Sequence, residues 1–157
     1  MDASLLNIIT LSLEVSLSAT AVVMVFSILL ALWLVASRSL LAKIVEITVY
    51  LPMAMPPVAL GYGMLLLVGN NAPLGRFLHN YLGIDVAFTF LGAVVAAVMV
   101  SLGIGVRTMR LALEAVERAQ IDNAYLLGAH KFQVFFYIVL PQCSKAILAG
   151  AVLVFIR

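Results

Sequence analysis

The residue types that carry out most protein chemistry are sparse in this sequence, and their spacing matches no catalytic or metal-binding pattern. Histidine occurs only at His79 and His130, and the one cysteine is Cys143. No Cys or His pair has the spacing of a metal site, and no Ser/His/Asp or Cys/His grouping indicates nucleophilic catalysis. The sequence contains no GxxxxGK[ST] loop to hold nucleotide phosphates. We expect no catalytic residue, cofactor or metal in this chain, so any work that it does must draw energy from a partner.

Among the seven acidic residues, only Glu46 lies beside the interior of a long apolar run. An ionisable group in that position could relay protons. Lys43 lies three residues earlier, about one helical turn away, so an ion pair at the edge of an apolar helix explains Glu46 more simply.

The elements that must position these residues are membrane helices. Apolar residues make up 65% of the 157 residues and charged residues 10%, and the mean hydropathy is +1.20. Soluble domains are about half apolar and about a quarter charged, so this composition indicates an integral membrane protein. The formal net charge of +2 is too small to favour binding to nucleic acid.

Charged residues divide the chain into long apolar runs. The uncharged runs cover residues 15–36, about 47–68 and 86–106. The first is roughly 33 Å long as a helix, enough to cross a hydrocarbon core of about 30 Å. A fourth apolar run begins after Lys145 and reaches Ile156. The sequence predicts an all-α polytopic helical bundle with three full spans and a truncated fourth.

Lysine and arginine gather between alternate runs. Those between the first and second runs are Arg38 and Lys43, the one between the second and third is Arg76, and those between the third and fourth are Arg107, Arg110, Arg118, Lys131 and Lys145. Cationic residues accumulate on the cytoplasmic side of a membrane. We therefore expect the N-terminus and the 69–85 loop outside, and the segment from Arg107 to Lys145 inside.

The second run contains a cluster of helix-breaking residues, Pro52, Pro56 and Pro57, with Gly61 shortly after them. Each proline removes a backbone donor and clashes with the preceding turn, so this span is expected to break or kink. A broken span can line a pathway, because its freed carbonyls need water or protein around them. A kink that serves packing alone is the alternative.

The cytoplasmic segment is predicted to contain a helix followed by a shorter element. Residues 110–120 are strong helix formers. The apolar side chains that can share one face of this helix are Leu111, Val116, Ala119, Ala124 and Leu127. The helix is expected to end at Gly128 in a left-handed conformation. An amphipathic loop lying on the membrane surface is the alternative interpretation.

A motif with defined spacing runs through this segment. Asp122-Asn-Ala124 is followed after three residues by Gly128, and after nine more by Ile138-Val-Leu140-Pro141. This order resembles the signature of permease subunits of binding-protein-dependent ATP-binding-cassette importers, which reads Glu-Ala-Ala, three residues, Gly, nine residues, Ile-x-Leu-Pro. The Gly-to-Pro part matches at every defined position, whereas Glu-Ala-Ala is relaxed to Asp-Asn-Ala. The resemblance implies that Asp122, Ala124, Gly128, Ile138, Leu140 and Pro141 form the ATPase-coupling motif.

Further residues along the chain look like those of molybdate permeases in order and spacing. They are Leu51-Pro52, Pro56-Pro57, Gly61-Tyr62, Pro73-Leu74-Gly75, Gly83-Ile84, Ala87-Phe88-Thr89, Gly92-Ala93-Val94, Val106-Arg107, Arg110-Leu-Ala-Leu-Glu114 and Phe135-Phe136. Tungstate and sulfate/thiosulfate permeases are close relatives, so these anions are alternatives.

The resemblance implies a single permease domain over residues 1–157, with a coupling loop at about 107–145 that docks into a cleft of a cytoplasmic ATPase subunit. It also implies a homodimer in the bacterial plasma membrane, a periplasmic or extracellular oxyanion-binding protein, and ATP bound by the ATPase alone. Members of the family continue beyond the position of Arg157, so we expect a C-terminally incomplete domain.

Other classes of protein explain the sequence less well. A secondary transporter should carry paired repeats and mid-membrane ionisable groups, and neither is evident. A non-transporting membrane scaffold, as truncation could produce, leaves the Gly128-to-Pro141 pattern unexplained. Hydroxyl residues along the runs are candidates for a pathway, although such residues often serve helix packing. They are Ser16, Ser18, Ser27, Tyr62 and Ser101.

Overall fold

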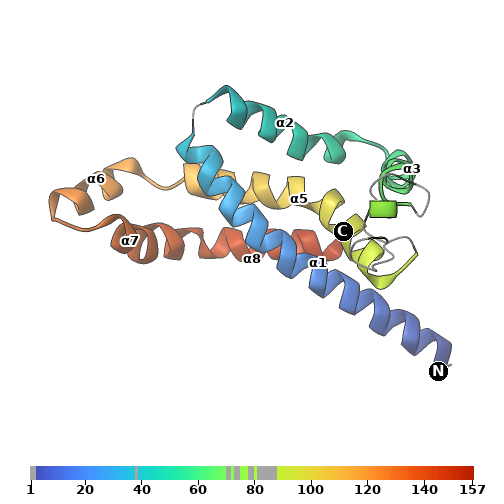
Figure 1. The fold of residues 1–157 in the computed structure, drawn as a ribbon. Coiled ribbons are helices and arrows are strands. Elements are labelled where there is room, and N and C mark those ends of the chain that lie inside the picture. Colours follow the sequence, from blue (N-terminus) through green and yellow to red (C-terminus); the bar gives the residue numbers. More distant parts are fainter. Residues whose placement is uncertain (1–2, 38, 70–71, 73–74, 78–79, 81–87) are drawn as a thin grey trace.

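The computed structural model describes residues 3–37, 39–69, 72, 75–77, 80 and 88–157. Its elements are α1 (Ala3–Ala36), α2 (Leu40–Ala54), α3 (Pro57–Val68), α5 (Phe90–Glu114), α6 (Arg118–Leu126), α7 (Lys131–Val134), the π-helix η1 (Phe135–Val139) and α8 (Leu140–Ile156). These elements are all helical, which confirms the all-α class (Figure 1). Most of the predicted outer loop, with His79 and Asp85, lies outside the described residues, as does Arg38.

Three helical stretches are long and apolar enough to cross a membrane by themselves: Leu5–Ala36, Phe90–Glu114 and Lys131–Ile156. The pair α2 and α3 would make a fourth if it forms one broken span. The last stretch begins well before Lys145, because α7, η1 and α8 follow one another without a gap. Similarly, α1 begins at Ala3 rather than near Val15. The positions of charged residues therefore predicted the ends of the apolar runs. They did not predict the ends of the helices, which continue past charged residues.

The break in the second run is confirmed, and prolines mark it. Pro52 lies inside α2, which ends at Ala54, and the next helix begins at Pro57. The two helices are bent by 119°. Proline lacks an N–H but fits the first turn of a helix, so Pro57 is suited to start α3 after the bend. A side chain at Gly61 would meet no atom within 4 Å, so this glycine does not mark a close helix contact.

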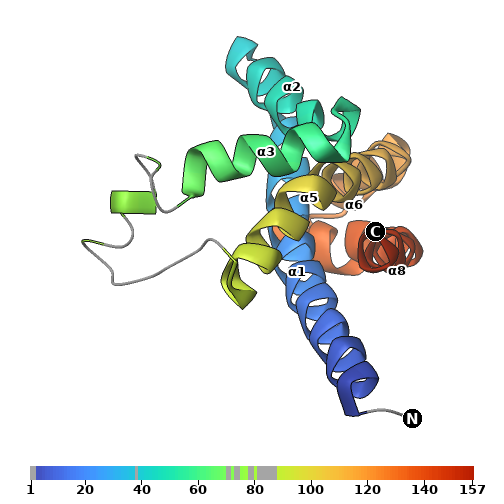
Figure 2. The same ribbon diagram turned by 90° about the vertical axis from the view of Figure 1, so that its right-hand side faces the viewer.

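The core of the bundle is the packing of α5 against its neighbours. Figures 1 and 2 show that α5 lies between α2 and α8. Helix α1 runs obliquely across α5. At the crossing of α1 and α5, Val23, Ser27 and Val106 are fully buried. Glycines allow the close approach: a Cβ on Gly105 would collide with the Ser27 hydroxyl, and one on Gly150 would lie 2.9 Å from Met109 Cε. Such small-residue contacts are typical of helix packing in membranes.

The expected helix from Arg110 to Leu127 is interrupted. The helix α5 continues through Glu114, a turn covers residues 115–117, and α6 starts at Arg118. The turn buries Val116, which is 7% exposed, while Leu127 remains 89% exposed. The predicted apolar stripe therefore does not form one face. Helix propensity is a weak local preference that tertiary structure can override, and here the strong helix formers do not continue the helix.

Candidate functional site: the segment between α5 and α8

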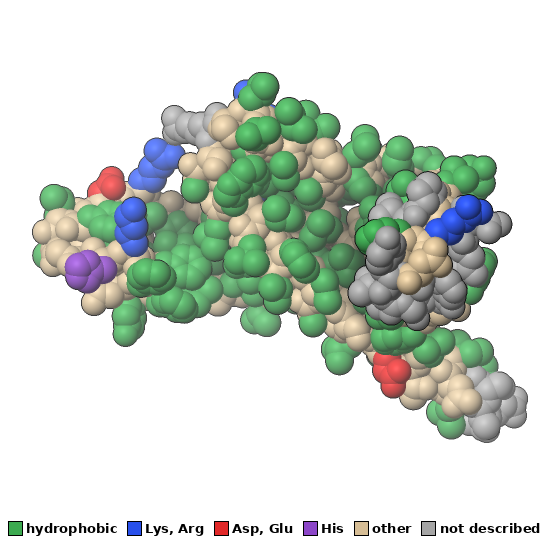
Figure 3. All heavy atoms as spheres, viewed as in Figure 1, with side chains coloured by type: hydrophobic (Ala, Val, Ile, Leu, Met, Phe, Trp, Pro, Cys, Tyr) green, Lys and Arg blue, Asp and Glu red, His purple; other side chains and the backbone are tan. Residues whose placement is uncertain are grey.

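The segment that carries the sequence motif extends beyond the apolar bundle. Helices α6 and α7 form a hairpin at one end of the molecule (Figure 1). Figure 3 shows that basic, acidic and histidine side chains gather over this end of the visible face, while the middle of that face is almost entirely apolar. A lipid-facing surface must be apolar and an aqueous one need not be, so the hairpin end of this face is suited to an aqueous phase.

Helix α6 presents its side chains outward. None of its residues is buried against the rest of the chain. Asp122 and Asn123 are exposed, and Ala124 is partly exposed. An amphipathic helix that rested on its own bundle would bury one face, so α6 is free to place a face against another protein. The coupling role that the motif implies for its first half stays a prediction.

Gly128 ends α6 in the conformation that the sequence predicts. Its φ is +85°. The Gly128 N–H donates to the Tyr125 carbonyl at 3.0 Å, and the Ala129 N–H donates to the Ala124 carbonyl at 3.0 Å. This pair of bonds is the Schellman motif, which requires a left-handed residue and therefore favours glycine. Two motif residues, Ala124 and Gly128, thus both belong to this Schellman motif.

The second half of the hairpin has its own start signal, which the sequence analysis did not identify. The His130 N–H donates to the Gln133 side-chain oxygen at 2.8 Å as α7 begins. A glutamine three residues after the cap position, reaching back to the cap N–H, is half of a capping box. The bond uses the His130 backbone, so it explains Gln133 as part of the start of α7.

Pro141 coincides with a wide helical turn. Residues Phe135–Val139 form a π-helix, and the Leu140 N–H donates to the Phe135 carbonyl, five residues back. Proline cannot donate to the preceding turn and its ring crowds the carbonyl four residues earlier. Wide π turns occur mainly as short insertions within α-helices, frequently at functional sites. The end of the motif therefore places an irregular turn between the hairpin and α8.

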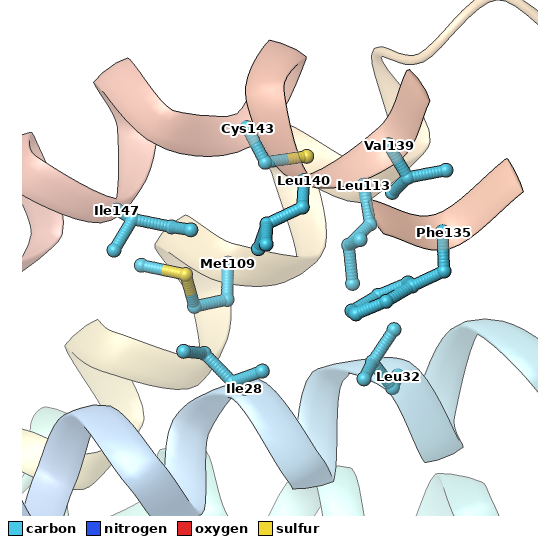
Figure 4. Close-up of a pocket in the computed structure, with 9 residues that line it drawn as sticks. All are labelled: Ile28, Leu32, Met109, Leu113, Phe135, Val139, Leu140, Cys143 and Ile147. Carbon is cyan, nitrogen blue, oxygen red and sulfur yellow. The ribbon is translucent and has the colours of Figure 1, made fainter. Parts of the chain in front are cut away.

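The residues around this turn pack against the bundle. Figure 4 shows side chains from the chain near the π-helix pointing toward those of α1 and α5. The gap between them has a volume of about 20 Å³. Its lining is apolar: Ile28, Leu32, Met109, Leu113, Phe135, Val139, Leu140, Cys143 and Ile147. A gap of this size holds one water at most, and its apolar lining gives water no partner. The apolar side chains around the gap pack the base of the hairpin against α1 and α5. Cys143 is one of these side chains.

The six motif residues do not form one cluster. Asp122, Ala124 and Gly128 lie on the exposed hairpin. Ile138, Leu140 and Pro141 lie where the hairpin enters α8, and Leu140 reaches the apolar gap. A direct link between the parts comes from outside the motif: the Gln142 amide donates to the Gln120 side-chain oxygen.

A second link joins α5 to α2. Arg110 forms ion pairs with Glu46 on α2 and with Glu114 on its own helix, the latter at 2.8 Å. The expected partner of Glu46 was Lys43, so the sequence identified the type of interaction but not the partner. Lys43 is on the same helix, whereas Arg110 comes from a distant part of the chain. A cross-helix ion pair explains Glu46 without a proton relay.

The ion pairs face a recess of about 610 Å³ at the end of α1, the start of α2 and the end of α5. Lys43, Arg118 and Glu114 also line it, with Val116 from the turn before α6. Charged groups thus surround the base of the hairpin.

Known proteins are similar to this chain along most of its length. The family model described as "Binding-protein-dependent transport system inner membrane component" matches residues 23–157. The chain is 35% identical over 156 residues to the molybdenum transport system permease protein ModB of Haemophilus influenzae, covering 97% of this chain and 66% of that protein.

Two further relatives extend the comparison. The molybdenum transport system permease protein ModB of Escherichia coli (strain K12) is 38% identical over 95% of this chain and 65% of its own length. The sulfate transport system permease protein CysW of the same strain is 34% identical over 97% of this chain and 52% of its own length. The chain thus spans about two thirds of the length of these molybdenum permeases.

Proposed function

The chain belongs to the family of inner membrane components of binding-protein-dependent transport systems, and from this premise we propose that it is the transmembrane permease subunit of an ATP-driven molybdate importer. The observation that carries the proposal is identity of 35% and 38% to molybdenum permeases along nearly the whole chain. Sulfate is the second candidate substrate, because a sulfate permease is 34% identical over a similar stretch. Both are tetrahedral oxyanions.

In the proposed mechanism, an ATPase subunit binds the α6–α7 hairpin. Exposed Asp122 and the Gly128 turn form the contact surface, and the Gln120–Gln142 bond carries its movement to α8. ATP binds to the ATPase, and this chain supplies no catalytic group. The bundle then alternates between two arrangements whose balance the nucleotide shifts. Two copies of the chain form the pathway between them, and a periplasmic or extracellular binding protein delivers the anion.

Uptake by reconstituted vesicles tests the function. We expect the chain, together with its ATPase and binding protein, to accumulate molybdate inside vesicles only when ATP is present. A complex whose ATPase cannot hydrolyse ATP is the control, and sulfate replaces molybdate in a parallel series. Uptake of sulfate but not of molybdate would assign the second substrate, and uptake of neither would contradict the proposal.

We further propose that the N-terminus lies outside the cell and the hairpin inside, because basic residues crowd the Arg107–Lys145 segment. Cysteine replacing Asn71 or Asn123, each in a Cys143→Ser background, tests this orientation. In intact cells, a membrane-impermeant thiol reagent should label Asn71→Cys at least ten times faster than Asn123→Cys. The order should reverse in inside-out vesicles. Equal labelling of both sites from the outside would overturn the orientation.

A further inference from the structure

Helices α2 and α5 lie side by side (Figures 1 and 2). One contact joins Glu46 of α2 to Arg110 of α5. Another lies at Gly103 of α5, where an added Cβ would lie 3.6 Å from Met53 Cβ of α2. Met53 follows Glu46 along α2, whereas Gly103 precedes Arg110 along α5. The two helices therefore run antiparallel, with one contact toward each end of α2.

The contact at Gly103 brings the two backbones together. A Cβ on Gly103 would lie 2.9 Å from the Val49 carbonyl oxygen, so a larger residue would push α2 away from α5. Glycine at such positions lets membrane helices pack closely. The contact lies just before α2 ends at Ala54, and the bent α3 begins at Pro57. The part of α2 next to the break is therefore tightly packed on α5.

Arg110 holds the first half of α2 against α5. Its guanidinium pairs with Glu46 across the helices and with Glu114 on its own helix, the latter at 2.8 Å. A planar guanidinium has several N–H donors in a fixed geometry, so one arginine can bind two carboxylates at once. The Arg110 and Glu46 side chains are 27% and 29% exposed. Partial shielding from water makes their attraction stronger than that of a fully exposed pair.

The same arginine lies beside the base of the hairpin. Glu114 is the last residue of α5, and α6 begins at Arg118. Arg110 is thus about one helical turn before the segment that leads into the hairpin. Its own helix connects it to that segment, and Glu46 connects it to the helix that carries the break. A displacement of the hairpin therefore has a direct route to α2 through Arg110.

We propose that Arg110 is a positioning residue that makes α2 follow the hairpin, so that a displacement of the hairpin by the ATPase moves the broken span formed by α2 and α3. The inference rests on the proposed function and deepens it, because it assigns a residue to the coupling between hairpin and bundle. Glu46 is the acceptor on α2, and the close approach at Gly103 carries the movement on to the break. Arg110 acts through Glu46 and touches neither ATP nor the anion.

The ratio of molybdate taken up to ATP hydrolysed separates coupling from stability. If the ion pair served stability alone, its loss would lower uptake and hydrolysis together. In vesicles containing the ATPase and supplied with the binding protein, Glu46→Gln should lower this ratio about fivefold or more. The ATPase should still co-purify with this variant and hydrolyse ATP. Glu114→Gln is the matched control, because it changes the other carboxylate of the same arginine and leaves the cross-helix pair. Its ratio should stay near that of the parent chain.

An exchange of charges tests the pairing itself. Glu46→Arg alone and Arg110→Glu alone place like charges opposite each other, so each should lower the ratio at least as much as Glu46→Gln does. The double variant, Glu46→Arg with Arg110→Glu, again sets a guanidinium opposite carboxylates, now with the guanidinium on α2. It should recover much of the parent ratio.

Two results would overturn the role of Arg110 while the proposed function stands. One is a parent-like ratio for Glu46→Gln, and the other is a double variant that couples no better than the single reversals. If the parent chain transports neither molybdate nor sulfate, the proposed function itself fails.

Discussion

Replacing Gly128 by valine is expected to abolish ATP-dependent uptake while leaving the amount of protein in the membrane near normal. The φ of +85° at this position belongs to the left-handed region, which β-branched residues hardly adopt. A non-glycine residue there loses about 1 kcal/mol or more. The Schellman bonds at the end of α6 would be strained, and the turn that presents Asp122 would change shape. The apolar helices are formed by other residues and should still insert.

Space alone does not limit this position within the chain, since a Cβ on Gly128 would meet no atom within 4 Å. Two control variants accompany Gly128→Val. The first separates the effect of backbone conformation from that of side-chain size. Gly128→Asn, a residue that tolerates left-handed backbone, should keep much of the uptake. Asn123→Ala, which restores the family's alanine, should have little effect. Co-purification of the ATPase is the measurement. If Gly128→Val keeps its ATPase and still transports, the hairpin does not have the docking role proposed for it.

Replacing Gly105 by valine is expected to cause a large loss of stability in the bundle. A Cβ there would collide with the Ser27 hydroxyl and lie 2.9 Å from Val23 Cγ1, both fully buried. Helix α1 would have to move away from α5 along its main contact. Inserting methyl groups into a packed interior costs about 1–3 kcal/mol. We expect the unfolding temperature in detergent to fall by several degrees.

Two controls make this result specific to the helix crossing. Gly63→Val adds the same side chain where a Cβ would meet no atom within 4 Å, so its effect should be much smaller. The double variant Ser27→Gly with Gly105→Ala removes the colliding hydroxyl and should be more stable than Gly105→Ala alone. Thermal unfolding of the purified proteins measures all of them. Equal stability of Gly105→Val and the parent chain would contradict the observed packing.

Features that depend on residues close together in the sequence could be predicted from the sequence. The break near Pro56 and Pro57 follows from the missing N–H and the fixed φ of proline, and the structure has it at Met55–Pro56. The left-handed Gly128 follows from the way helices end. Long uncharged runs predicted the apolar helices, because a bilayer requires every backbone group to be paired within a helix. The spacing of the motif also pointed to the family.

Only the tertiary structure decided which distant residues meet. Glu46 pairs with Arg110 rather than with nearby Lys43, and Ser27 meets Gly105, because the crossing of helices places them together. The turn after Glu114 buries Val116, and this burial depends on the packing of distant segments. Gly150 lies far from Thr108 and Met109 in the sequence, yet the packing of α8 on α5 brings them together. Periodicity and composition describe each helix by itself, whereas the depth and partners of a side chain depend on how the helices pack.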